Sequence, residues 1–250
     1  MDIFFVVIFG LVIGSFLNVC ICRIANEEES IAFPPSHCTS CGYELKPKDL
    51  IPVLSYIFLG GKCGNCKEKI SIQYPIVEIL NAVLYIVIYL KFGFTLELFK
   101  FCLLASLLIV IGFIDFKTKN VYSSTIIFGV VIGIVFAALE WIETRNIPWD
   151  YIGGAFIGFI IIYLIVILTK GMGEGDIDIA LVCGLFLGIK GVLLTLFIAI
   201  VLGGLVATII LILKIKDKKA EIAFGPYLAI GGLITCLYGN KIIEFYLKLF

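Results

Sequence analysis

Long, nearly continuous apolar stretches dominate this chain and restrict what it can fold into. Eight stretches are candidates for crossing a bilayer: 3–22, 74–90, 96–114, 121–141, 151–169, 177–189, 192–213 and 224–238. A membrane-spanning helix needs about 20 apolar residues, because the hydrocarbon core is about 30 Å thick. Two of the stretches are short, and 177–189 is the one we expect to lie among other helices. We therefore predict an all-α polytopic membrane protein with about eight transmembrane helices.

The composition supports this class and excludes several others. Hydrophobic residues make up 61% of the 250 residues and charged residues 15%. A soluble domain has about 45–50% apolar and about 25% charged residues, so a soluble enzyme is excluded. The apolar stretches do not alternate with polar residues, which argues against a transmembrane barrel. Because the net charge is zero and no long basic tract occurs, we expect the lipid bilayer as a partner and no nucleic acid.

One large polar segment interrupts the apolar pattern and divides the chain into three parts. These parts are a first transmembrane helix (1–24), a Cys-rich domain (25–73) and a membrane domain with about seven helices (74–250). If the Cys-rich domain is cytoplasmic, 13 Lys and Arg residues lie inside and 6 outside, which together are the 19 in the chain. Loops rich in Lys and Arg stay in the cytoplasm. We therefore predict that the Cys-rich domain and the turns after 114 and at 170–176 share the cytoplasmic face.

Four of the nine cysteines form two C-x2-C pairs in the polar segment, and they suggest a metal site. The pairs are Cys38 with Cys41 and Cys63 with Cys66, separated by 21 residues. This spacing approximates that of a tetrathiolate zinc site. Two disulfides are the alternative, but the reducing cytoplasm argues against them. We predict a zinc-ribbon-like domain whose zinc is structural, because a four-thiolate site has no open position. His37, the only histidine, is either a further ligand or an exposed loop residue.

Two aspartates at the ends of predicted spans are the candidates for catalysis. Asp115 ends the third span and Asp176 begins the sixth, and the predicted topology puts both at the cytoplasmic membrane edge. Ionisable groups within spans are costly and are usually functional. Two neighbouring carboxylates repel each other, so one stays protonated while the other takes a proton from water. The alternative is that each aspartate caps a helix or pairs with a nearby lysine.

The residues around these aspartates add two further observations. Gly171, Gly173 and Gly175 alternate directly before Asp176, and such a backbone can approach an extended peptide or present amides to an oxyanion. A phosphate loop is the competing interpretation, but the G-K-[ST] ending is missing and no strand precedes the run. Glu78 and Asn81 share one face of the second span. They either form hydrogen bonds between helices or contribute to function.

The order and spacing of these motifs resemble those of a known family, the bacterial type IV prepilin leader peptidases. These are membrane aspartyl proteases with a G-x-G-D signature. The similar segments are 14–19 with Arg23 after it, the two cysteine pairs with 50–56 between them, 70–78, 173–176 and 224–227. The similarity extends along most of the chain.

The resemblance implies an aspartic endopeptidase in the inner (plasma) membrane. It would remove the basic leader from type IV prepilins or pseudopilins at the cytoplasmic face, with Asp115 and Asp176 as the catalytic pair. Many members also methylate the new N-terminus with S-adenosylmethionine, and Glu78 is our candidate for a contributing residue. The alternative is a non-enzymatic membrane transporter or assembly scaffold with a zinc-binding loop. A transporter should have paired broken helices near the bilayer midplane, whereas these aspartates lie at span ends.

Two positions depart from the family pattern. Residues 121–123 read Val-Tyr-Ser where the family usually has Ile-Pro-Asp, and Asp178 stands where it usually has Lys. Asp176 and Asp178 lie two residues apart at a helix start and therefore point about 200° apart. We expect only Asp176 to face Asp115.

Overall fold

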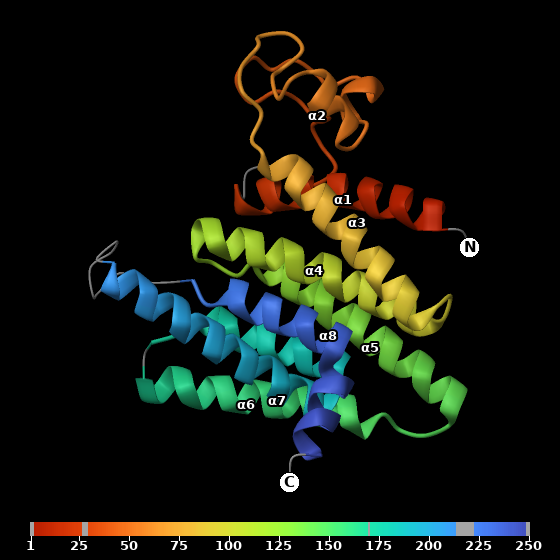
Figure 1. The fold of residues 1–250 in the computed structure, drawn as a ribbon, viewed down its shortest axis with the longest axis vertical. Coiled ribbons are helices and arrows are strands. Elements are labelled where there is room, and N and C mark those ends of the chain that lie inside the picture. Colours follow the sequence, from red (N-terminus) through yellow and green to blue (C-terminus); the bar gives the residue numbers. More distant parts are fainter. Residues whose placement is uncertain (1–2, 27–29, 170, 214–222, 249–250) are drawn as a thin grey trace. The chain divides into compact units, whose positions relative to one another are not determined.

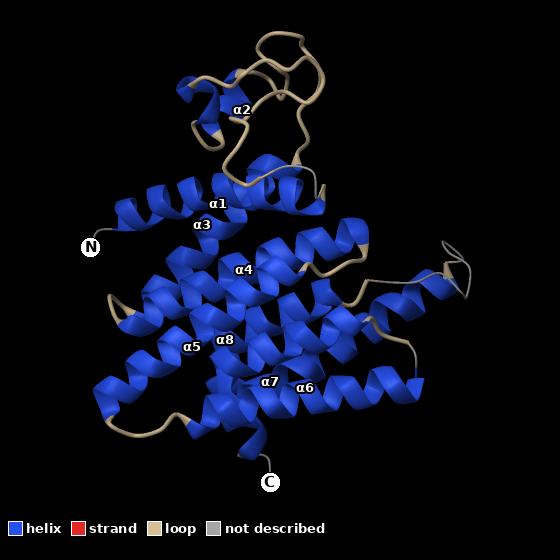
Figure 2. Ribbon diagram, turned by 180° about the vertical axis from the view of Figure 1, so that it is seen from behind, coloured by secondary structure: helices blue, strands red, loops and turns tan. Residues whose placement is uncertain are grey.

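The computed structural model describes residues 3–26, 30–169, 171–213 and 223–248, and in these ranges it contains helices and no β-strand (Figure 2). Seven of its helices are long and apolar enough to cross a membrane. The prediction of an all-α polytopic membrane protein is therefore confirmed. Five lysines that we assigned to the cytoplasmic face lie outside the described residues: Lys170, Lys214, Lys216, Lys218 and Lys219.

The chain forms two compact units, Met1–Val110 and Ile111–Phe250. In Figure 1 the first unit runs from red to yellow-green and the second from green to blue. The first unit contains the following elements: α1 (Ile3–Ala25), η1 (Pro47–Leu50), α2 (Leu54–Phe58), α3 (Gln73–Phe92) and most of α4 (Leu96–Thr118). The polar segment 26–72 carries η1 and α2 and has little regular structure.

Close packing of α1 on α3 defines the first unit. A side chain at Gly10 would place its Cβ 2.7 Å from the Cα of Ala82, and one at Gly14 would place it 2.6 Å from the Cα of Glu78. Such small residues let two membrane helices approach through their backbones. The amide of Asn81 donates a hydrogen bond of 2.8 Å to the Gly10 carbonyl. The interhelical interpretation of Asn81 is therefore confirmed.

The second unit contains the end of α4 and four further helices: α5 (Ser123–Thr144), α6 (Trp149–Thr169), α7 (Glu174–Ile212) and α8 (Gly225–Leu247). Of these, α7 spans 39 residues but is interrupted at Gly188, where the backbone has φ 73° and ψ −176°. Glycine adopts a positive φ without steric cost, so it permits a sharp bend here.

The bend at Gly188 turns α7 into a helical hairpin. A Cβ at Gly158 in α6 would lie 2.6 Å from the Ala180 carbonyl oxygen and 2.8 Å from Cγ2 of Val192. Those two atoms are therefore within 5.4 Å of each other (2.6 + 2.8), whereas 12 residues of straight helix rise about 18 Å. The chain must reverse, which gives two arms, 174–187 and 189–212. The predicted spans 177–189 and 192–213 are thus the two arms of one element.

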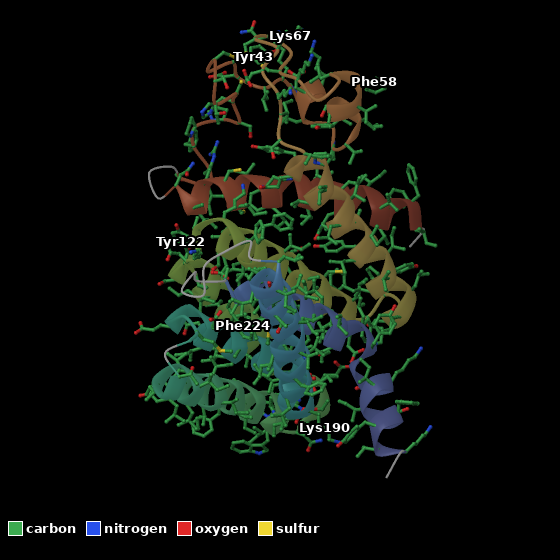
Figure 3. The ribbon with its side chains drawn as sticks, turned by 60° about the vertical axis from the view of Figure 1, so that its left-hand side comes forward. Tyr43, Phe58, Lys67, Tyr122, Lys190 and Phe224 are labelled. Atoms are coloured by element: carbon green, nitrogen blue, oxygen red, sulfur yellow. The ribbon has the colours of Figure 1, made fainter. Side chains whose placement is uncertain are left out.

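Contacts around the bend fix one end of the second unit. The Ile189 amide donates a hydrogen bond of 3.3 Å to the side chain of Asp150 at the start of α6. Figure 3 shows Lys190 near this end of the unit, whereas Tyr122 and Phe224 lie toward the other. Asp176 precedes Gly188 by 12 residues, so it lies about 18 Å from the bend along the first arm.

Candidate active site and candidate zinc site

The two predicted catalytic aspartates are both buried in the second unit. Asp115 lies in the last turn of α4 and Asp176 in the first turn of α7, and each side chain is only 4% exposed. Both belong to the second unit, and the end of α4 and the first arm of α7 approach the same residue, Gly225. The structure therefore brings together the two aspartates that the sequence predicted.

Backbone amides hold each carboxylate in place. The Gly225 amide at the start of α8 donates a hydrogen bond of 2.9 Å to Oδ2 of Asp115. The Gly173 amide before α7 donates one of 3.0 Å to Oδ2 of Asp176. An amide bond to a carboxylate is charge-assisted and fixes the orientation of the side chain. The bond to Asp176 is part of the N-terminal cap of α7, so the capping alternative is confirmed for Asp176. Pairing of either aspartate with a lysine finds no support among the described contacts.

Gly225 is the central packing position of this site, and the sequence analysis included it only within the family-like segment 224–227, without assigning it a role. A Cβ at this position would lie 2.6 Å from Oδ2 of Asp115 and 3.1 Å from Cδ1 of Ile179, which follows Asp176 by nearly one turn. Residue 225 therefore sits between the end of α4 and the first arm of α7. A side chain would occupy the space of the catalytic groups. The only sequence signal was a Gly-Pro pair before an apolar run.

The turn after α4 packs directly on the glycine run. A Cβ at Gly175 would lie 2.5 Å from Cβ of Val121. Val121 is the first residue of the segment 121–123 that departs from the family pattern. The other departure, Asp178, is exposed, while Asp176 is buried, so the two side chains have different surroundings.

The first arm of α7 is too short to cross a bilayer alone. Its 14 residues, 174–187, rise about 21 Å, whereas the hydrocarbon core is about 30 Å thick. If the bend at Gly188 lies at one membrane surface, Asp176 lies below the other.

The four cysteines of the C-x2-C pairs come together in the first unit. The sulfurs of Cys38, Cys41, Cys63 and Cys66 all lie within 4.8 Å of one another, and those of Cys38 and Cys66 are 3.8 Å apart. Four ligands at about 2.3 Å in a tetrahedron around zinc would be about 3.8 Å apart. A disulfide would hold two sulfurs at about 2.05 Å, and all nine cysteines are free. The cluster therefore fits a tetrathiolate zinc ion.

The two cysteine pairs adopt the same backbone turn. The Cys38 amide donates to the Tyr43 carbonyl, and the Cys63 amide donates to the Glu68 carbonyl. In both turns the fourth residue after the first cysteine has a positive φ, 68° at Gly42 and 63° at Lys67. Two equivalent turns aim four sulfurs at one point, as in zinc knuckles.

Local hydrogen bonds favour the thiolate form, which a metal requires, at Cys63. The backbone amides of Cys66 and Asn65 lower the pKa of the Cys63 thiol to about 7. At Cys66, burial and the other three cysteines raise the pKa instead. Nδ1 of His37 lies 3.0 Å from the Pro35 carbonyl oxygen, and His37 is not part of the four-cysteine cluster. Its interpretation as a loop residue is therefore the better one.

Glu78, our candidate for a contribution to methyl transfer, is buried in the first unit. Its Oε2 accepts a hydrogen bond of 2.7 Å from the Val53 amide. This bond connects the polar segment to α3. The contacts of Glu78 are those of a structural anchor.

Comparison with known proteins identifies the family. Residues 8–92 match the bacterial peptidase A24 N-terminal domain, and residues 102–208 match the type IV leader peptidase family. A prepilin leader peptidase/N-methyltransferase of Bacillus subtilis (strain 168) is 34% identical over 97% of this chain and 96% of its own length. The chain belongs to the type IV leader peptidase family. Proteins of the same name from Pseudomonas putida and Pseudomonas aeruginosa are each 30% identical, over 94% and 97% of this chain and 90% and 92% of their own lengths.

No solved structure matches this leader peptidase. Its membership of a peptidase family disfavours the transporter or scaffold that the sequence left open. The leader peptidase match, 102–208, includes both Asp115 and Asp176, whereas the N-terminal domain match includes the four-cysteine cluster.

Proposed function

We propose that this protein is an aspartic endopeptidase that removes the basic leader from type IV prepilins or pseudopilins, with Asp115 and Asp176 as its catalytic pair. The observation that carries the proposal is the pair of buried carboxylates, each held by one backbone amide. Family membership supplies the substrate class, because the relatives are named prepilin leader peptidases.

The chemistry follows from one shared proton. The ionised carboxylate takes a proton from a water molecule, and the resulting hydroxide attacks the carbonyl carbon of the scissile amide. The protonated carboxyl then donates its proton to the leaving nitrogen as the C–N bond breaks. Burial excludes bulk water, which strengthens the interaction of both carboxyls with the reacting atoms. A site near the membrane edge reaches a peptide where a transmembrane helix ends, which suits a membrane-anchored precursor.

The test compares three neutral substitutions in cells that also produce a prepilin. Asp115→Asn and Asp176→Asn should each abolish leader removal, because an amide cannot act as a base. Asp178→Asn is the matched control, since it removes an exposed charge two residues from Asp176, and it should retain most of the activity. Membrane levels of each variant are measured in parallel. Loss of cleavage in Asp178→Asn at normal protein levels would refute the assignment.

We infer that the Cys-rich domain and the catalytic aspartates face the cytoplasm. The support is the distribution of Lys and Arg residues over the predicted loops. A cysteine introduced at Lys48, which is exposed, should resist an impermeant maleimide in intact cells and react in inverted vesicles. A cysteine at the exposed Glu143, in the last turn of α5, should show the reverse pattern. Labelling of the Lys48 variant in intact cells would invert this topology.

A second activity, N-methylation of the new N-terminus, is proposed from the names of the relatives, which include N-methyltransferase. S-adenosylmethionine would supply the methyl group. Glu78, whose carboxylate accepts a hydrogen bond from the Val53 amide, stays our candidate for a residue that contributes to the transfer. Mass spectrometry of the mature pilin distinguishes the outcomes: an added methyl group supports the proposal, and an unmodified amine from an actively cleaving enzyme contradicts it.

For zinc, the four cysteines of the cluster would bind one ion that holds the two turns together. The ion would act structurally, because four thiolates leave no open coordination position for a substrate. The residues of the cluster lie in the first unit and the catalytic pair in the second.

A further inference from the structure

A group of exposed apolar side chains on the polar segment has no role in the proposed hydrolysis. It comprises the following residues of η1, α2 and the link between them: Leu50, Ile51, Leu54, Ile57 and Phe58. The side chain of Phe58 is 84% exposed and that of Ile57 is 63% exposed. A contiguous exposed apolar patch marks a surface that contacts a partner or a membrane. We call these five residues the apolar patch.

The tether to Glu78 fixes the depth of this patch. The Val53 amide, in the middle of the patch, lies 2.7 Å from Oε2 of Glu78. Glu78 is the sixth residue of α3, so it lies about 7 Å along the helix axis from Gln73. With 20 residues, α3 is about 30 Å long and just crosses the hydrocarbon core. If α3 crosses the membrane, the bond to Glu78 holds Val53 about 7 Å below the membrane surface. Residues of α3 at that level have exposed side chains.

This depth matches that of an interfacial anchor. Segments that lie in the membrane interface bury their apolar face about 5–10 Å into the boundary between headgroups and acyl chains. At the same level of α3, Ile76 and Ile79 are also exposed, as expected of helix residues that face lipid at this depth. The apolar patch at this depth is therefore more stable in contact with lipid than in contact with water.

The charged residues around the apolar patch are also distributed as in a segment that lies in the membrane interface. Residues 50–61 contain no charged side chain, and five exposed lysines flank them: Lys46, Lys48, Lys62, Lys67 and Lys69. Only three acidic residues accompany these lysines in residues 30–72: Glu44, Asp49 and Glu68. Figure 3 shows Phe58 on the side of the segment toward the N-terminal end of α1, and Tyr43 and Lys67 on the other side. Lysines at this position meet anionic headgroups while the apolar residues enter the leaflet.

We propose that the apolar patch inserts into the leaflet on the side of the Cys-rich domain and that the flanking lysines bind anionic lipid headgroups. The patch and the Glu78 tether then hold the four-cysteine domain flat against the membrane. The hydrophobic insertion and the lysine contacts act together, because two weak membrane signals give stable anchoring where one does not. This inference does not depend on the catalytic assignment.

The test measures the depth of single tryptophans in reconstituted full-length protein. Trp141 and Trp149, the two native tryptophans, are replaced by Phe. Into this background go Phe58→Trp as the reporter, Ile57→Trp as a second reporter, and Glu44→Trp as the control on the exposed cysteine turn. The vesicles contain phosphatidylcholine with brominated acyl chains and phosphatidylglycerol. Quenching by bromine in the lipid and by iodide in the water is then compared.

We expect brominated lipid to remove most of the emission of both reporters and iodide to leave it nearly unchanged. The Glu44→Trp control should show the opposite behaviour. The proposal is overturned if both reporters respond to iodide as strongly as the control and do not respond to brominated lipid. Replacing phosphatidylglycerol by phosphatidylcholine should weaken the lipid quenching, and identical quenching would overturn the part assigned to the lysines. The readout is fluorescence, so its failure is separate from any failure of leader cleavage.

Discussion

Replacing Gly225 by alanine should inactivate the enzyme without unfolding it. The added Cβ would lie 2.6 Å from Oδ2 of Asp115, where ordinary contact begins at about 3.4 Å, so the carboxylate must shift by about 0.8 Å (3.4 − 2.6). The shift also breaks or lengthens the hydrogen bond of 2.9 Å from the Gly225 amide. A misplacement of about 1 Å in a catalytic group costs about a hundredfold in rate. We therefore expect the rate of leader removal by Gly225→Ala to fall about a hundredfold.

The assay uses purified enzyme in lipid nanodiscs with a full-length prepilin and follows leader release over time. Gly204→Ala is the matched control: it makes the same substitution at a helical glycine whose Cβ would meet nothing within 4 Å. This control should cleave at the rate of the unchanged protein. Equal activity of Gly225→Ala and the unchanged protein would show that the amide of residue 225 does not position Asp115. Equal loss in both variants would indicate general destabilisation instead.

Three other changes test separate contacts. Gly175→Ala should lose activity because its Cβ would lie 2.5 Å from Cβ of Val121. Adding Val121→Gly, which removes that Cβ, should restore cleavage, and no rescue would contradict the packing argument. A Cys→Ser change at any position of the four-cysteine cluster should release zinc, as measured by metal analysis of the purified protein. Cys22→Ser, outside the cluster, should retain the zinc. If the unchanged protein contains no metal, the proposed site is refuted. Glu78→Ala leaves the Val53 amide without its hydrogen-bond acceptor, which should lower the free energy of opening around residue 53 by about 1–3 kcal/mol. If the Val53 amide exchanges its hydrogen as slowly as in the unchanged protein, the bond between Val53 and Glu78 does not hold this segment.

Local patterns determined the fold class and the identities of the chemical groups. Apolar runs of about 20 residues have no stable alternative to a membrane helix, because every backbone amide must be satisfied without water. Two C-x2-C pairs likewise predict a metal site, because the spacing within each pair already sets one turn. The ends of the apolar runs also predicted that Asp115 and Asp176 lie at the ends of membrane spans. Even the separation of Asp176 from Asp178 follows from helix geometry alone.

Only the tertiary structure decided how those groups meet. Apolar runs do not reveal that two predicted spans are the arms of one hairpin, because the reversal depends on a single φ at Gly188. The sequence also did not show that Glu78, buried beside Val53, anchors a loop. The contribution of Gly225 to the site was equally hidden, because its amide reaches Asp115 across 110 residues of chain. Periodicity and spacing report contacts within a few residues, whereas these three features depend on which distant backbones pack together.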